Sequence, residues 1–119
     1  MNINRLIQTV KKHPDYNDAG MILCHNGVVR NSSRAGAKVS GLRVKVDTEK
    51  LTSIIDEHKK RSGIIEILIE INEDRDLSVG DDVMFLVVAG DIRENVISTL
   101  SDVLNAVKKT VTSKTEFFI

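Results

Sequence analysis

Hydrophobic residues recur along this chain at two spacings, one typical of helices and one typical of strands. Ile3, Leu6 and Val10 lie three or four positions apart, which places them on one side of a short N-terminal helix. A longer stretch with helical spacing predicts a second helix over residues 91–111. Its hydrophobic positions are Ile92, Val96, Ile97, Leu100, Val103, Leu104 and Val107. A third helix is expected after Asp47, whose side chain can cap the helix N-terminus.

Four other segments have the length and composition of strands. They are residues 20–29, 39–46, 64–71 and 83–89. Within the second segment, hydrophobic residues alternate with Arg43 and Lys45, as in a half-buried strand. Residues 78–82 have turn chemistry, so the strands on either side should pair in an antiparallel direction. Residues 115–119 either form a short final strand or present an apolar end to a partner.

The order of these elements predicts an α+β fold with a mixed or mainly antiparallel sheet and about three helices. A chain of 119 residues fits one domain, so we expect residues 1–119 to share a single core. Hydrophobic residues make up 41% of the chain and charged residues 29%, which is typical of a globular domain and excludes a disordered one.

Charge and targeting signals exclude several classes of function. Lys+Arg and Asp+Glu both number 17, so no overall field attracts nucleic acid or an anionic membrane. The first residues show no basic segment followed by an apolar one, so a secretory signal is not expected, and no apolar run approaches the roughly 20 residues that a membrane span needs. The single cysteine, Cys24, lies in an apolar run and is expected to be a buried hydrophobic residue. These features predict a cytoplasmic protein without disulfides.

Familiar cofactor and metal motifs are absent from the sequence. There is no Walker A pattern, no GxGxxG after a strand, no HExxH and no paired-cysteine spacing. The three histidines, His13, His25 and His58, are too far apart to resemble a ligand pattern. We therefore expect neither a metal site nor an organic cofactor.

Basic residues are the remaining candidates for chemistry. Arg30 follows the first strand, Arg93 lies in the first turn of the last helix, and Lys108, Lys109 and Lys114 lie at or beyond its end. Lysines near a helix C-terminus are favoured by the helix dipole, so two of them have an ordinary structural explanation. Arg93 places a positive charge near the positive N-terminal end of the helix dipole, which is unfavourable, so a functional reason for this residue is more plausible.

The ordered set of local patterns resembles the large, catalytic subunit of molybdopterin synthase over nearly the whole chain. The matching pieces are residues 20–23, 27–31, Leu42, Val44, residues 48–51, 79–83, 87–89, Arg93, Lys108 and residues 114–116. In that family the large subunit dimerises and accepts the C-terminal Gly-Gly tail of a small ubiquitin-like subunit that carries sulfur as a thiocarboxylate. Two sulfur transfers then convert cyclic pyranopterin monophosphate into the dithiolene of molybdopterin.

The resemblance implies a role for four residues of this chain. Arg30 and Arg93 would bind the anionic substrate or tail, and Lys108 and Lys114 would be the catalytic lysines. An arginine can bind phosphate or carboxylate through two hydrogen bonds, and a lysine near other cations can serve as base or nucleophile. The implied partners are the small sulfur-carrier subunit, a pterin phosphate substrate and a second copy of the chain, in a homodimer or heterotetramer. No cofactor is implied.

Several positions depart from the family pattern. Ile92 stands where the family commonly has a histidine, and residues 72–76 replace a His-Arg-x-Gly stretch. Aligning Lys114 with the second family lysine requires a one-residue deletion. Arg93 and Lys108 are also fifteen positions apart, roughly 22 Å along a helix, so they cannot share one small pocket within one chain.

Two further interpretations stay open beside the enzyme. One is a relative that has lost the reaction and acts as a dimeric binding module. The other is a protein-interaction dimer that uses the apolar residues 117–119.

Overall fold

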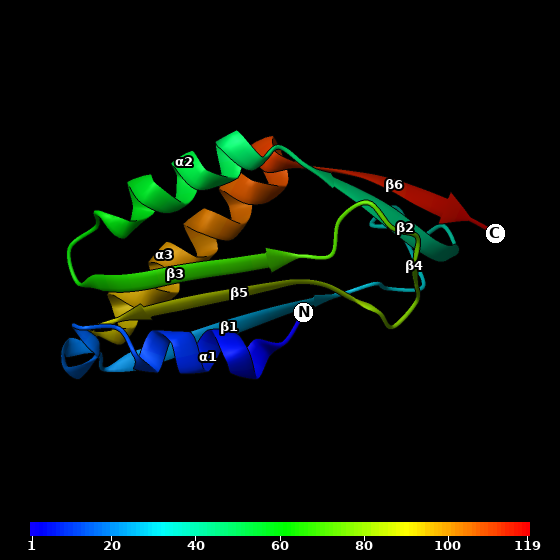
Figure 1. The fold of residues 1–119 in the computed structure, drawn as a ribbon. Helices are drawn as coiled ribbons and strands as arrows, with labels where there is room; N and C mark the ends of the chain where they lie inside the picture. Colours follow the sequence, from blue (N-terminus) through cyan, green and yellow to red (C-terminus); the bar gives the residue numbers. More distant parts are fainter.

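Two three-stranded antiparallel sheets organise the computed structural model, which describes residues 1–119 (Figure 1). The first sheet has the order β1 (Met21–Val28), β5 (Asp82–Gly90), β3 (Ile64–Ile71), and the second has the order β4 (Leu77–Ser78), β2 (Val39–Val46), β6 (Thr112–Phe118). The helices are α1 (Ile3–Lys11), α2 (Thr48–Lys59) and α3 (Arg93–Ala106), with a 3-10 turn η1 (Tyr16–Asp18) and a π-helical turn η2 (Val107–Val111). The predicted α+β fold with three helices is confirmed, and all strand pairing is antiparallel.

The central strand β5 carries the core of the first sheet because both of its faces are covered. Phe85, Val87 and Ala89 pack against Leu6 and Val10 of α1. The alternate β5 residues Met84, Leu86 and Val88 join a cluster with residues of α3 and η2 on the opposite face. Burial on both faces explains why this strand is a continuous hydrophobic run instead of an alternating one.

Helices α1 and α2 begin where short polar side chains can accept hydrogen bonds from free backbone N–H groups, whereas the N-cap of α3, Ile92, has no such side chain. Asn2 Oδ1 accepts from Asn4 N at 3.0 Å at the start of α1, and Asp47 Oδ1 accepts from Lys50 N at 3.1 Å at the start of α2. Before α3, Asp91 Oδ1 accepts from Asn95 Nδ2 at 2.9 Å and from Ile92 N at 2.6 Å. These two hydrogen bonds lower the pKa of Asp91 below its ordinary value. None of the helices is long and apolar enough to cross a membrane.

The predicted helix over residues 91–111 is divided in the structure. The α-helical part ends at Ala106, and residues 107–111 form the π-helical turn η2. Both Val107 and Val111 are buried in the core there, and the wider turn keeps both of them inside. The final strand is consequently longer than predicted, since β6 begins at Thr112.

The prediction that Cys24 is buried was wrong. β1 is an edge strand, α1 packs mainly over β5, and the Cys24 side chain is exposed. Partial desolvation still raises the pKa of its thiol, which disfavours the reactive thiolate.

Gly63, just before β3, packs closely against the start of α3. Its φ is +80°, and an added Cβ would collide with Asp91 Oδ1 and lie 2.6 Å from Asn95 Nδ2. Gly36 has a similar φ of +92°, but an added Cβ there meets nothing within 4 Å. We expect Gly36→Ala to cost about 1 kcal/mol through left-handed strain alone, and Gly63→Ala to cost about 3 kcal/mol or more. Urea unfolding of both variants measures this, and equal losses would contradict the packing described.

Candidate functional site

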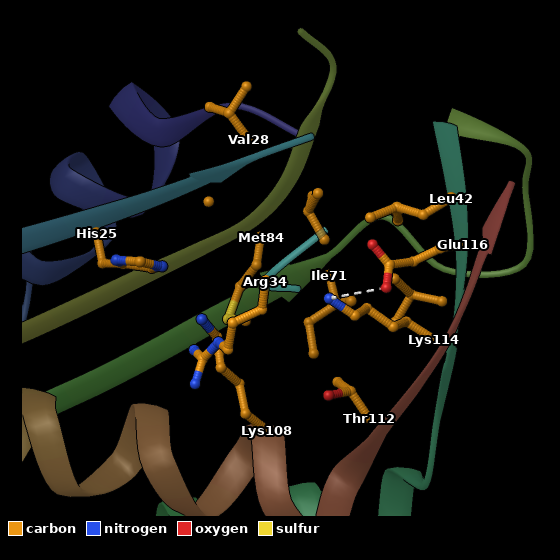
Figure 2. Close-up of a pocket in the computed structure, with 13 residues that line it drawn as sticks. His25, Val28, Arg34, Leu42, Ile71, Met84, Lys108, Thr112, Lys114 and Glu116 are labelled. Atoms are coloured by element: carbon orange, nitrogen blue, oxygen red, sulfur yellow. Dashed lines mark ion pairs between the residues drawn. The ribbon is translucent and has the colours of Figure 1, made fainter. Parts of the chain in front are cut away.

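An open cavity of about 610 Å³ lies where the two sheets meet (Figure 2). Its size is typical of a small-molecule site. Its apolar wall comes from both sheets and consists of Val28, Leu42, Val44, Ile71, Val83 and Met84. The cavity therefore depends on the way β2 and β6 are held against the ends of β3 and β5.

Four basic side chains reach this cavity from four different segments. His25 comes from β1, Arg34 from the loop between β1 and β2, Lys108 from η2 and Lys114 from β6. Glu116 is the one acidic residue of the lining, and its Oε1 lies 4.0 Å from Lys114 Nζ. Figure 2 shows that pair as a dashed line and the side chains of Lys108 and Arg34 extending toward one another.

The cavity carries a net positive charge. Neither Arg34 nor Lys108 takes part in any ion pair of the structure. Two cations without an acidic partner, set beside an apolar wall, form a site that attracts a phosphate or carboxylate group. No group of three or more His, Cys, Asp or Glu side chains gathers in a way that could hold a metal ion.

The turn η2 determines which lysine faces the cavity. Val107 is 0% exposed and Val111 is 4% exposed, so both anchor the turn in the core. The Thr110 hydroxyl donates to Ala106 O at 2.8 Å. With the turn fixed in this way, Lys108 lines the cavity, whereas Lys109 lines a separate, shallower hollow beside Lys45.

The loop that carries Arg34 is closed on itself by short-range hydrogen bonds. Ser33 N donates to Ala37 O at 2.8 Å, and Ala37 N donates to Ser33 Oγ at 3.1 Å. Arg34 lies within the closed segment, is exposed, and reaches the cavity from its open side. A guanidinium at this position can offer two parallel hydrogen bonds to an entering anion.

His25 has the least satisfied polar atom of the site. Its strand partner across the sheet is Leu86, so the ring lies on the face covered by α3. The Nε2 atom is buried without a hydrogen-bond partner, which costs about 1–3 kcal/mol for an ordinary polar group. Burial lowers the pKa of His25, and the charge of Lys108 lowers it further, so the ring is neutral at pH 7.

The structure brings together two of the four residues that the sequence singled out. Lys108 and Lys114 line the same cavity. Arg30 does not line it, because its Nε donates to Ser32 O at 2.9 Å on the exposed loop. Arg93 lies at the opposite end of α3, where its side chain is 77% exposed beside Glu94.

Three cavity residues were missed by the sequence analysis, namely His25, Arg34 and Glu116. Arg34 lies in the same loop between β1 and β2 as Arg30, and only the fold decides which arginine reaches the cavity. His25 and Gly27 are two positions apart and therefore lie on the same face of the strand. A polar ring beside a glycine on one strand face is the sequence signal that could have indicated His25.

The comparisons with known proteins agree with this architecture. The model of the MoaE protein family matches residues 1–110 of the chain. The chain therefore belongs to the MoaE family, the large subunits of molybdopterin synthase. No curated protein matches it.

Solved structures show the same fold at low sequence identity. The molybdopterin synthase of Staphylococcus aureus is 22% identical with a TM-score of 0.73, over 86% of this chain and 77% of that chain. The MoaE protein of Burkholderia ambifaria is 15% identical with a TM-score of 0.76, over 99% and 83%. A complex of subunits 1 and 2 of the molybdopterin-converting factor from Helicobacter pylori is 14% identical with a TM-score of 0.72, over 99% and 84%.

Replacing His25 by Phe should stabilise the protein. The ring volume is retained while the unpartnered nitrogen is removed, so we expect the free energy of unfolding to rise by about 1 kcal/mol at pH 7.5. The pKa of His25 is lowered by folding, so the wild type loses stability as the pH falls through the unfolded value of 6.5. The advantage of His25→Phe should therefore be larger at pH 5.5, as measured by urea unfolding at both pH values.

His58 is the matched control because its Nδ1 already lies 2.7 Å from Ile54 O. His58→Phe should give no such gain. A His25→Phe variant that is less stable than the wild type at both pH values would contradict this description of the cavity.

Proposed function

We propose that this protein is the catalytic subunit of a molybdopterin synthase. It accepts the thiocarboxylated Gly-Gly tail of a small ubiquitin-like sulfur-carrier subunit and transfers the sulfur to cyclic pyranopterin monophosphate. The observation that carries this proposal is that Lys108 and Lys114 line one cavity in a chain of the MoaE family. Membership of the family supports the type of reaction, and the cavity is the site where we expect it to occur.

The composition of the cavity suits the proposed substrates. A thiocarboxylate tail and a cyclic phosphate are both anions, and Lys108 and Arg34 are cations without acidic partners. The apolar wall can bury the methylene groups of a diglycine tail and a face of the pterin. Binding both anions beside two lysines brings the sulfur and its acceptor together, which is the main requirement of a transfer between two substrates.

The two lysines would have different roles because their surroundings differ. Lys108 lies on an anchored turn and has no acidic partner, so its full charge is available to stabilise negative charge that develops during transfer. Lys114 Nζ lies 4.0 Å from Glu116 Oε1, so this carboxylate offsets part of its charge. We assign Lys108 as the principal catalytic residue and Lys114 as the second.

Arg30 and Arg93 fit the proposal as substrate-binding or tail-binding residues in an assembly of several chains. Both side chains are exposed at the surface, and neither reaches the cavity of its own chain. A homodimer, or a heterotetramer with the small subunit, would let one chain present them to a neighbour. The exposed Phe118 and Ile119, beside the open edge of β6, are suited to such a contact.

A second candidate is a binding module that retains the tail site without the reaction. It is favoured by Ile92, which stands 53% exposed at the head of α3 where the resembling family commonly has a histidine. This candidate requires the cavity but does not require both lysines.

The paired variants Lys108→Ala and Lys109→Ala distinguish these functions. Both remove one exposed lysine from the same turn, but only Lys108 lines the cavity. Lys108→Ala should lower single-turnover conversion of the pterin at least about a hundredfold, as expected for loss of a positioned catalytic group, while partner binding survives. Lys109→Ala should convert the pterin at nearly the wild-type rate.

The measurement mixes the enzyme, in excess over the cyclic pterin, with the thiocarboxylated small subunit and subtracts the conversion seen without enzyme. Equal rates for wild type and Lys108→Ala would remove Lys108 from the mechanism. A wild type that binds the partner but converts nothing would establish the binding module instead.

A further inference from the structure

The buried nitrogen of His25 is not used by the proposed sulfur transfer. Nε2 has no hydrogen-bond partner, and the ring lines the same cavity as Lys108 and Arg34 (Figure 2). Buried polar atoms of native proteins nearly always have a hydrogen-bond partner, supplied by the protein, by ordered water or by a ligand. The partner must therefore be sought among the molecules that enter the cavity.

The position of Gly27 shows where this nitrogen lies. An added Cβ at Gly27 would be 3.4 Å from His25 Nε2, so the ring extends along the strand toward the glycine and toward the cavity. Met84 lies opposite Gly27 across the sheet and also lines the cavity. Nε2 is thus directed along the cavity wall and away from the core residues around Leu86.

Charge determines which ligand suits the ring. Lys108 faces His25 from η2, Arg34 from the loop before β2, and Lys114 with Glu116 from β6 across the cavity. A proton on His25 would add a positive charge to a site that already has an excess of cations. An anion between these groups reverses that balance, because it attracts the proton that the cations repel.

We propose that His25 is an anion-binding residue of this cavity: Nε2 donates a hydrogen bond to an oxyanion held by Lys108 and Arg34, and His25 takes up one proton when that anion binds. The ligand is an oxygen-bearing anion, either a phosphate-like group or a C-terminal carboxylate. The inference rests on the proposed function only in taking the cavity as the site of an anionic substrate.

The proton uptake makes anion affinity depend on pH. In the free protein the pKa of His25 lies below 6.5, and a bound anion raises it. Affinity should therefore increase as the pH falls from 8 to 6, since the bound form holds a proton that the free form lacks. Histidine is the residue type of this lining that ordinarily titrates in that range.

The test follows the three histidine ring signals by NMR between pH 5.5 and 8, with and without sulfate, which remains a dianion throughout. Sulfate should raise the titration midpoint of His25 by about one pH unit and bind up to about tenfold more tightly at pH 6 than at pH 8. The signals of His13 and His58 should not respond, because neither residue lines the cavity. A peptide that ends in Gly-Gly with a free carboxylate forms the second arm and identifies which anion moves His25.

Two variants separate the hydrogen bond from the proton. His25→Gln retains an N–H donor and should bind sulfate without the pH dependence, and His25→Phe should bind more weakly and also lose the pH dependence. An unchanged His25 midpoint with bound anion, or the same pH dependence in His25→Phe, would overturn the inference. Failure of both anions to bind while the sulfur-transfer assay succeeds would also overturn it and would leave the proposed function standing.

Discussion

The turn η2 is the element on which the arrangement of the site depends, because it joins the core of the first sheet to the edge of the second. Val107 and Val111 are buried on one side of the turn, and Thr112 continues directly into the pairing of β6 with β2. Asp47 N also donates to Val111 O at 2.9 Å, which ties the start of α2 to the same point. With both ends fixed, the turn has little freedom, and Lys108 faces the cavity.

This constraint places charge beside an apolar wall. The core holds η2 in a position where Lys108 approaches Arg34 and the neutral ring of His25, and no carboxylate neutralises the first two. Such an arrangement is unfavourable for the empty protein and favourable once an anion enters. Binding sites of this kind often lower the stability of the empty protein. The expected rise in the free energy of unfolding of His25→Phe agrees with this.

Much of the fold could be predicted from the spacing of hydrophobic residues, but this spacing predicts the site only in part. The three helices and the strands β1, β2, β3 and β5 were predictable because each has a continuous pattern over eight or more residues, whereas the two-residue strand β4 has none. The end of α3 was not, because the sequence around Val107 keeps helical spacing while the burial of Val111 favours a wider turn. Cys24 was misassigned because nothing in the sequence indicates that α1 leaves this part of β1 uncovered.

The site residues show the same limit. Lys108 and Lys114 could be named from the family resemblance, and the structure brings them to one cavity. Arg30 and Arg34 belong to one polar loop, and only its closure through Ser33 and Ala37 directs Arg34 toward the cavity. The position of His25 in the cavity could not be predicted, because it depends on the sheet register that places the residue on the α3 face opposite Leu86.

Methionine methyl NMR tests most directly whether the cavity between the sheets receives the partner's tail. The chain has three methionines, and of these only Met84 lines the cavity, while Met1 is terminal and Met21 begins β1 at the opposite end of that strand. Adding a small subunit that ends in Gly-Gly should shift the Met84 methyl signal and leave Met1 and Met21 in place, and removal of the two terminal glycines should abolish the shift. A partner that binds without moving the Met84 signal, or that moves it equally well without the glycines, would contradict the account.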